Sequence, residues 1–257
     1  ISIDERNISV PFLKNYLSEY DDKVPYMIGT LMDYSTQDST YISHKDFLMG
    51  MIYLHQGDVE LSNQRIDSYL QNNFNDSRAY QIKGDYYMYH EDYLSALFNY
   101  RKSDQIQDGN SYSLYKQSLC LLELEKYTES ITVLNKVIKM EPYHQDAYYF
   151  RGLAHTLKLQ YNNGIKDFTD HILINPDNLE TYYYLGLCYY NIQQYHRAKE
   201  ALVRYIKFDN ENPDAHYYLG LIYENILDID KAISHFSIAR KFNSQFDESN
   251  LRLGMIH

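Results

Sequence analysis

Residues 179–212 read LETYYYLGLCYYNIQQ followed by YHRAKEALVRYIKFDNEN, and this stretch decides the fold. Both halves place apolar or small residues at the spacing of one helical face. In the first half these are Tyr182, Leu185, Gly186 and Tyr189, and in the second Ala198, Leu202 and Tyr205. The stretch therefore predicts two amphipathic helices joined by a short polar turn. A helix pair of this size cannot bury its apolar face alone, so we expect neighbouring pairs to stack on it.

The same pattern returns every 34 residues along the chain. Six of the ten glycines fall on one lattice with this period: Gly50, Gly84, Gly152, Gly186, Gly220 and Gly254. Small residues also occupy a second lattice twelve positions later: Ser62, Ala96, Ser130, Gly164, Ala198 and Ala232. Internal repetition at this period indicates a repeat architecture. We interpret the small residues as the places where two helices approach too closely for a larger side chain.

Over 34 residues, the order of aromatic, Leu-Gly, tyrosine, alanine, aromatic, alanine and proline resembles the tetratricopeptide repeat. The resemblance implies an all-α fold, a right-handed superhelical α-solenoid of about six helix-turn-helix repeats. We expect the six repeats at 43–76, 77–110, 111–144, 145–178, 179–212 and 213–246. Asp46 and His216 depart from the family pattern, because an aromatic residue is usual at their position.

The two ends of the chain do not follow the full repeat. Residues 1–42 are predicted to form a divergent N-terminal helical hairpin that caps the array and ends in a polar linker at 35–40. Residues 247–257 resemble a first helix alone, so we expect a C-terminal helix or half-repeat there. Terminal repeats of a solenoid are usually atypical.

Composition excludes several classes of protein. The 257 residues include 30 tyrosines and carry a formal net charge of −11, which argues against nucleic-acid binding because such proteins need a basic face. The longest apolar runs are too short for direct membrane insertion. Two separated cysteines, Cys120 and Cys188, favour a reducing compartment such as the cytoplasm. An export signal could have been removed before Ile1, so the localisation stays open.

No motif in the sequence predicts catalysis, a cofactor or a metal. There is no glycine-rich phosphate loop, no paired-cysteine zinc pattern and no metalloprotease helix. His155 and His171 stand at core-type positions of the two helices in one repeat. They could serve a metal or acid–base role, but we favour a pair of core imidazoles with satisfied hydrogen bonds. The sequence thus predicts a protein that is not an enzyme.

The family resemblance implies that first helices line a concave groove that binds partner polypeptides. Positions two, five and nine of each repeat would face this groove, and tyrosine, leucine and acidic residues gather there. The candidate partner-binding residues are Tyr115, Tyr149, Leu153, Tyr183, Tyr184, Leu187, Tyr217, Tyr218 and Leu221, with Asp146, Glu180 and Asp214 at the rim. Because acids are common in the first turn of any helix, the rim residues could instead only complement the helix dipole.

We expect a protein or peptide ligand with an apolar or amphipathic segment and basic flanks. Chaperone-binding relatives hold an acidic C-terminal tail with a lysine, asparagine and arginine clamp, and this sequence lacks that clamp. The matching positions hold Tyr149, Leu153, Tyr184, Asp214 and Tyr218. Two alternatives to a free-standing scaffold stay open: a regulatory or targeting segment of a larger enzyme or assembly machine, and self-association through the terminal repeats.

Overall fold

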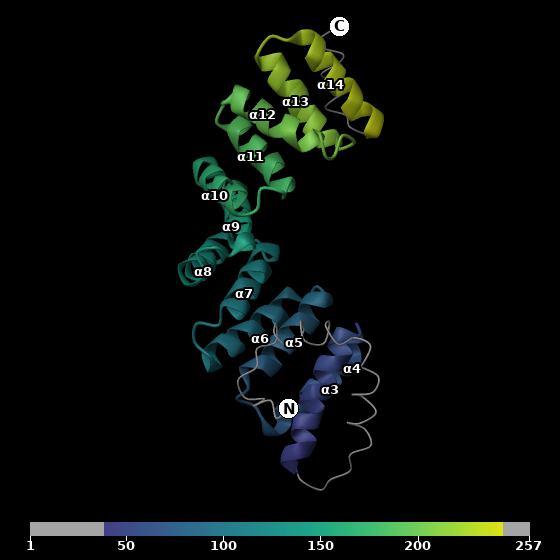
Figure 1. Ribbon diagram of the computed structural model, residues 1–257, viewed down its shortest axis with the longest axis vertical. Helices are drawn as coiled ribbons and strands as arrows, with labels where there is room; N and C mark the ends of the chain where they lie inside the picture. The colour runs from purple at the N-terminus through teal and green to yellow at the C-terminus, as the bar shows by residue number, and fades with distance from the viewer. Residues whose placement is uncertain (1–38, 244–257) are drawn as a thin grey trace. The chain divides into compact units, whose positions relative to one another are not determined.

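Twelve α-helices and no strand make up the part of the chain that the structure describes. This computed structural model describes residues 39–243, with side chains from residue 45 onward (Figure 1). The predicted all-α helical-repeat fold is confirmed. The chain divides into two units, Ile1–Lys126 and Tyr127–His257, which are described separately below.

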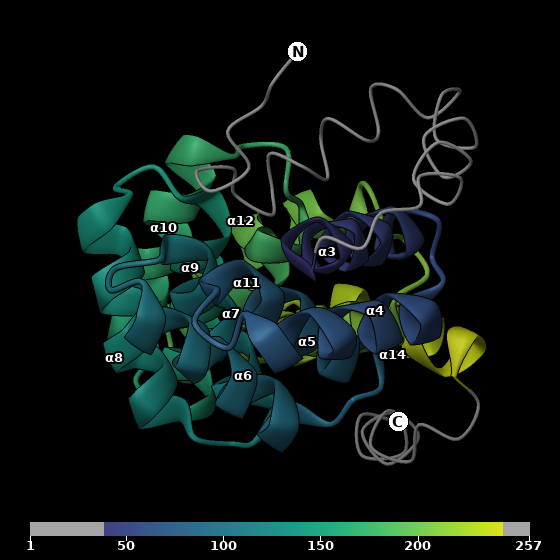
Figure 2. The ribbon, with the colours of Figure 1, turned by 90° about the horizontal axis from the view of Figure 1, so that it is seen from below.

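The first unit contains five described helices. They are α3 (Ser39–His55), α4 (Val59–Asn72), α5 (Ser77–Tyr89), α6 (Tyr93–Ile106) and α7 (Ser111–Glu123). Each packs against the next along the chain, with the tightest pairing between α3 and α4 and between α5 and α6 (Figure 2).

The second unit contains seven described helices. They are α8 (Tyr127–Met140), α9 (Gln145–Leu157), α10 (Tyr161–Ile174), α11 (Glu180–Asn191), α12 (Tyr195–Ile206), α13 (Pro213–Asn225) and α14 (Ile229–Phe242). The helices α9, α11 and α13 each pack against the helix that follows them, and α11 also contacts both α9 and α13.

Turn chemistry repeats with the same period as the helices. The second helices α4, α6 and α14 begin at Asp58, Asp92 and Asp228, whose carboxylates accept a hydrogen bond from the backbone N–H three residues later. Just before these caps, the chain takes a left-handed conformation at positions 34 residues apart. These residues are Gly57, Glu91, Glu125, Leu159, Gln193 and Leu227. Within each unit, the repeated turn joins two helices that pack against each other.

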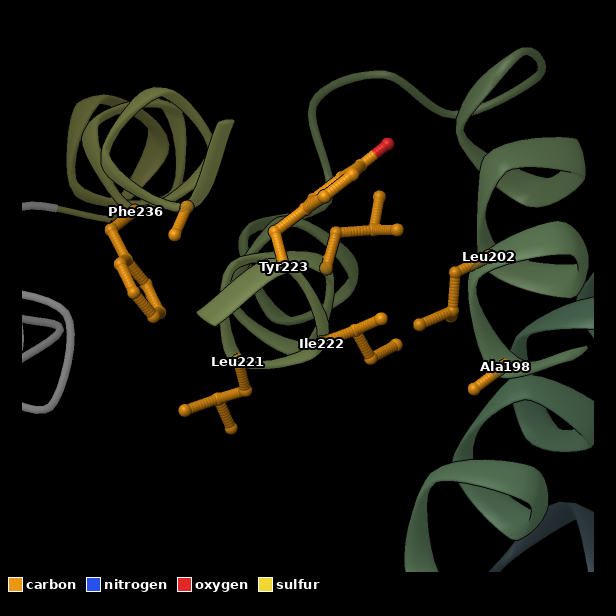
Figure 3. Packing of buried hydrophobic residues seen from close by; sticks show 8 residues of the cluster. Ala198, Leu202, Leu221, Ile222, Tyr223 and Phe236 are labelled. Carbon is orange, nitrogen blue, oxygen red and sulfur yellow. The ribbon is translucent and has the colours of Figure 1, made fainter. Parts of the chain in front are cut away.

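The five described glycines of the first lattice face large side chains on the following helix: Gly50, Gly84, Gly152, Gly186 and Gly220. A Cβ atom added to Gly220 would lie 2.5 Å from the Phe236 ring, and Gly84 stands equally close to the Tyr100 ring. The six residues of the second lattice are all buried. In the core around α13, Ile222 faces Ala198 and Leu202 of α12 (Figure 3). Both lattices therefore mark close helix contacts, as expected.

One boundary differs from the prediction. Helix α3 begins at Ser39, so the predicted linker at 35–40 extends two residues too far. The rest of the predicted N-terminal hairpin and the predicted helix at 247–257 lie outside the described residues. Within the described range, no helix has the length and apolarity needed to cross a membrane.

Candidate functional site

Eleven of the twelve candidate residues lie in the second unit, on α9, α11 and α13. Tyr115 alone lies in the first unit, on α7. The tyrosines of the three neighbouring helices form one set, which we call the tyrosine face. Its members are Tyr149, Tyr183, Tyr184, Tyr190, Tyr217 and Tyr218.

The tyrosine face is held together by edge-to-face ring contacts. The ring centroid of Tyr184 lies 5.9 Å from that of Tyr149 and 5.3 Å from that of Tyr183. On α11 and α13, the Tyr190 and Tyr218 centroids are 5.4 Å apart. Such T-shaped pairs are a favourable arrangement of aromatic rings. Five of the six predicted tyrosines therefore take part in these ring contacts, together with Tyr190, which the helical spacing also places on this face.

The same tyrosines also pack against the second helices. Tyr184 stacks on Phe168 at 5.9 Å, Tyr183 lies 5.2 Å from Tyr205, and Tyr217 lies 5.8 Å from Phe236. All six rings are consequently half-buried. One part of each ring stabilises the helix pair, and the remaining part is accessible from solvent.

The three candidate leucines do not share one environment. Leu153 and Leu187 are half-buried beside the tyrosines, but Leu221 is only 6% exposed. Leu221 belongs to a core cluster with Phe236 of α14 (Figure 3). The helical spacing placed Leu221 on the binding surface, whereas the structure makes it a packing residue of the second unit.

The acidic candidates lie in the first turns of the three helices, and all are exposed: Asp146, Glu180 and Asp214. The Tyr149 hydroxyl donates a hydrogen bond of 3.2 Å to Glu180 Oε2. Other side chains cap α9 and α13, since His144 Nδ1 accepts from the Ala147 N–H and Asn212 Oδ1 from the Ala215 N–H. The caps of α9 and α13 are therefore supplied by His144 and Asn212 rather than by Asp146 and Asp214.

Burial and the neighbouring groups keep the central tyrosines protonated. The pKa of Tyr149 is raised by burial and then by Tyr184 and Glu180. Burial likewise raises the pKa of Tyr183, with further contributions from Asp214 and Tyr218 of α13. Both side chains thus remain neutral phenols that can donate hydrogen bonds.

The helices that carry the tyrosine face contribute almost no positive charge. Neither α11 nor α13 contains a lysine or arginine, and α9 contains only Arg151. The Arg151 guanidinium is committed elsewhere, to Asp167 at 2.9 and 2.5 Å and to Asn135 at 2.7 Å. The pairing of Arg151 with Asp167 was not predicted from the sequence. The two residues are 16 positions apart, and Gly152 and Phe168, which face each other across the same two helices, have the same separation.

The corresponding face of the first unit has different chemistry. Tyr115 is half-buried, but the equivalent residues Phe47 and Gln81 are buried. Asp85, which takes the leucine position, accepts hydrogen bonds from the hydroxyls of Tyr100 at 2.7 Å and Tyr112 at 2.6 Å. The sequence shows that Asp85 replaces the leucine found at position nine of the later repeats, but it does not show the two tyrosines that donate to this carboxylate.

His155 and His171 do not form the pair that their positions suggested. His155 Nδ1 lies 2.7 Å from Gln160 Oε1, whereas the buried His171 places Nδ1 2.8 Å from Thr181 Oγ1. Burial lowers the pKa of His171, which favours its neutral form. Among the described residues, no group of three or more potential ligands is arranged to hold a metal.

A different histidine pair was not foreseen. His216 and His235 stack with their Nδ1 atoms 2.9 Å apart, and His216 Nε2 lies 3.0 Å from the Asn210 carbonyl oxygen. The cysteines, by contrast, are inert: Cys120 and Cys188 are free and fully buried. Burial raises the pKa of the Cys120 thiol to about 12 and that of the Cys188 thiol to about 11.

Two family models match parts of the chain. One describes the anaphase-promoting complex, cyclosome, subunit 3, and covers residues 158–238. The other describes the tetratricopeptide repeat and covers residues 112–142. A curated relative, the DnaJ protein P58IPK homolog A of Oryza sativa subsp. japonica, is 32% identical over 66 residues. The aligned part is 26% of this chain and spans only 14% of that relative.

Solved structures share the fold at low sequence identity. MamA 41-end from Desulfovibrio magneticus RS-1 is 23% identical, with a TM-score of 0.63 over 66% of this chain and 97% of that one. YrrB, described as a TPR protein with an unusual peptide-binding site, is 16% identical. It matches with a TM-score of 0.65 over 73% of this chain and 96% of its own.

Proposed function

Because the chain is a tetratricopeptide repeat protein, we propose that it is an interaction scaffold rather than an enzyme and that its tyrosine face binds a partner polypeptide. One observation carries the proposal. Six half-buried tyrosines on α9, α11 and α13 adjoin three exposed carboxylates, on helices whose one arginine or lysine is committed to Asp167 and Asn135.

Tyrosine suits a recognition surface of this kind. A half-buried ring offers a large apolar contact area, and few torsions must be frozen when a ligand binds. The Tyr149 and Tyr183 rings are already restrained by Tyr184, which reduces this cost further. An apolar or amphipathic segment would gain free energy by covering these rings.

The charge of the face selects the flanks of the ligand. Asp146, Glu180 and Asp214 are all exposed in successive first helices. A ligand with lysine or arginine beside its apolar residues would complement these carboxylates and associate faster at low salt. The peptide-binding site described for YrrB supports the idea that this fold can present such a surface.

Charge reversal at the rim tests the proposal with the tyrosine rings retained, although it removes the hydrogen bond from Tyr149 to Glu180. In the full chain, Glu180→Lys combined with Asp214→Lys should strongly reduce the capture of native partners from the source organism. The control is Glu200→Lys, which makes one such charge reversal at an exposed position of α12. Circular dichroism would establish that all variants keep the helical content of the wild type.

The outcomes are distinct. Loss of specific partners with the double variant, but not with Glu200→Lys, would support the tyrosine face as the binding surface. If the folded double variant captures the same partners in the same amounts as the wild type, the proposal is wrong.

A second candidate function follows from the family comparison. The match of residues 158–238 to the model of an anaphase-promoting complex subunit favours a chain that works as part of a larger assembly. Size measurement of the native complex would distinguish the two, because a subunit should migrate in a stable complex of defined composition. An adaptor would instead be recovered partly free.

A further inference from the structure

Helix α6 in the first unit exposes two large apolar residues on the side away from its core. It buries residues such as Ala96, Leu97 and Tyr100 against its neighbours. On the other side, Leu94 is 63% exposed and Phe98 is 67% exposed. Residues four apart lie one above the other on a helix, so these two side chains form a continuous apolar patch.

The patch is unusual within the chain itself. Leu94 and Phe98 occupy positions 18 and 22 of the repeat, on the outward side of the second helix. The other five repeats carry only polar residues at these two positions, and all of them are exposed: Glu60, Gln64, Thr128, Thr132, Asn162, Lys166, His196, Glu200, Asp230 and Ser234. The scaffold therefore does not require apolar residues here, and a local function accounts for them better.

A hollow lies beside the patch, between α4, α5 and α6. Its volume is about 460 Å³, and its apolar lining comes from Leu70, Tyr80, Tyr87, Leu94 and Phe98. The surface thus combines protruding side chains with a depression that could receive similar side chains. An interface between two identical copies needs this self-complementarity, because each copy contributes the same patch.

The charges around the patch are also self-complementary. Glu91, in the turn that precedes α6, and Arg101, within α6, are both exposed, and each stands three residues along the sequence from Leu94 or Phe98. Along the sequence, Ala96 lies midway between Leu94 and Phe98, and also midway between Glu91 and Arg101. If two α6 helices pack antiparallel about this point, Leu94 meets Phe98 of the second copy. Arg101 then lies near the start of α6 in the second copy, where Glu91 precedes the helix. The arrangement yields two apolar contacts and brings opposite charges together at both ends.

We propose that this chain self-associates through α6, with Leu94 and Phe98 of two copies packed antiparallel and flanked by Glu91–Arg101 pairs. The surface lies outside the tyrosine face, so it does not depend on the binding proposed there. An interface centred on one helix from each copy is small, and the association should be weak and dependent on concentration.

Sedimentation equilibrium of the full chain over a concentration series tests the proposal. The wild-type mass should rise from 30.7 kDa toward twice that value. Phe98→Ser, at an exposed position, should raise the dimer dissociation constant about tenfold or more. Arg101→Glu and Glu91→Arg should each raise it roughly two- to fivefold.

The combined charge swap is the decisive variant. Glu91→Arg with Arg101→Glu should restore an affinity close to that of the wild type, because both charge pairs re-form with reversed signs. Lys166→Glu, at the equivalent outward position of α10, is the matched control and should change nothing. Circular dichroism would confirm the fold of each variant.

Three results would overturn the proposal. The wild type could stay monomeric at every concentration, or its association could persist in folded Phe98→Ser. The combined swap could also stay as weak as the single variants, which would mean that the patch meets a different surface. Protection of the patch by another protein, with a wild type that is monomeric, would assign it to that partner instead.

Discussion

Gly186 of α11 lies directly against Leu202 of α12, so closely that a Cβ atom at Gly186 would meet Leu202 Cγ at 2.6 Å. The same relation holds between Gly152 and Phe168 in the preceding helix pair. The absence of a side chain at this position lets the two helices of each pair approach closely. The period-34 glycine lattice is therefore a packing requirement.

Replacement of Gly186 by leucine should destabilise the protein by about 1–3 kcal/mol, because the added side chain overpacks the contact with Leu202. Urea unfolding followed by circular dichroism measures the change. Glu200→Leu adds the same side chain on the exposed side of α12 and should stay within about 0.5 kcal/mol of the wild type. Equal stabilities for the two variants would contradict the assigned contact.

Leu227→Gly should stabilise the protein by about 0.5–1 kcal/mol. Leu227 has a φ of 62° and its side chain is 84% exposed, so it pays a steric cost and gains little from burial. Glycine adopts this conformation without that cost. Leu173→Gly is the control, since Leu173 is 79% exposed within α10, and it should lose about 1 kcal/mol. Thermal unfolding of both variants would decide, and a destabilised Leu227→Gly would refute the argument.

Acid should weaken the packing of α13 on α14 through His216 and His235. The Asn210 carbonyl can only accept, so His216 Nε2 carries a hydrogen and its Nδ1 accepts from His235 Nδ1–H. Burial, His216 and Lys231 together lower the pKa of His235 from 6.5 to about 4. Burial also lowers the pKa of His216, although the Asn210 carbonyl and Asp209 oppose this.

The sign of the effect follows from proton binding. Between pH 6.5 and about 4, the unfolded chain binds more protons at His235 than the folded chain. The contribution of this pair to the free energy of unfolding is therefore complete above pH 6.5 and is lost as the pH falls toward 4. The loss should amount to roughly 1–3 kcal/mol. His235→Asn, which can still donate to His216, should flatten the fall of the melting temperature over this range. His196→Asn, at an exposed position, should not. If the melting temperatures of the wild type and His235→Asn fall in parallel with pH, this mechanism is excluded.

The repeat could be read from the sequence because close helix packing restricts residue size. Glycine leaves room for residues such as Tyr100 and Phe236, where a Cβ atom would clash, so the period appears directly in the residue order. The start of α3 at Ser39 was not readable, since the polar residues 35–40 favour a linker by composition.

The candidate site was predictable only in part. Helical spacing identified the tyrosines of α9, α11 and α13 but not their contacts, because Tyr149 and Tyr184 meet only after two helix pairs have stacked. Spacing also could not show that Leu221 is buried in a core cluster that includes Phe236. Likewise, the two hydroxyls that satisfy Asp85 come from different helices, α6 and α7. Tertiary contacts decide all three features.

The most direct test of the tyrosine face is the affinity of the full chain for a synthetic helical peptide with leucines on one side and lysines on the other. The chain should bind this peptide, and Tyr183→Ala combined with Tyr217→Ala should cost about 2 kcal/mol or more, roughly a thirtyfold loss of affinity. Fluorescence anisotropy of the labelled peptide gives both dissociation constants. A folded double variant that binds the peptide as tightly as the wild type would contradict the account.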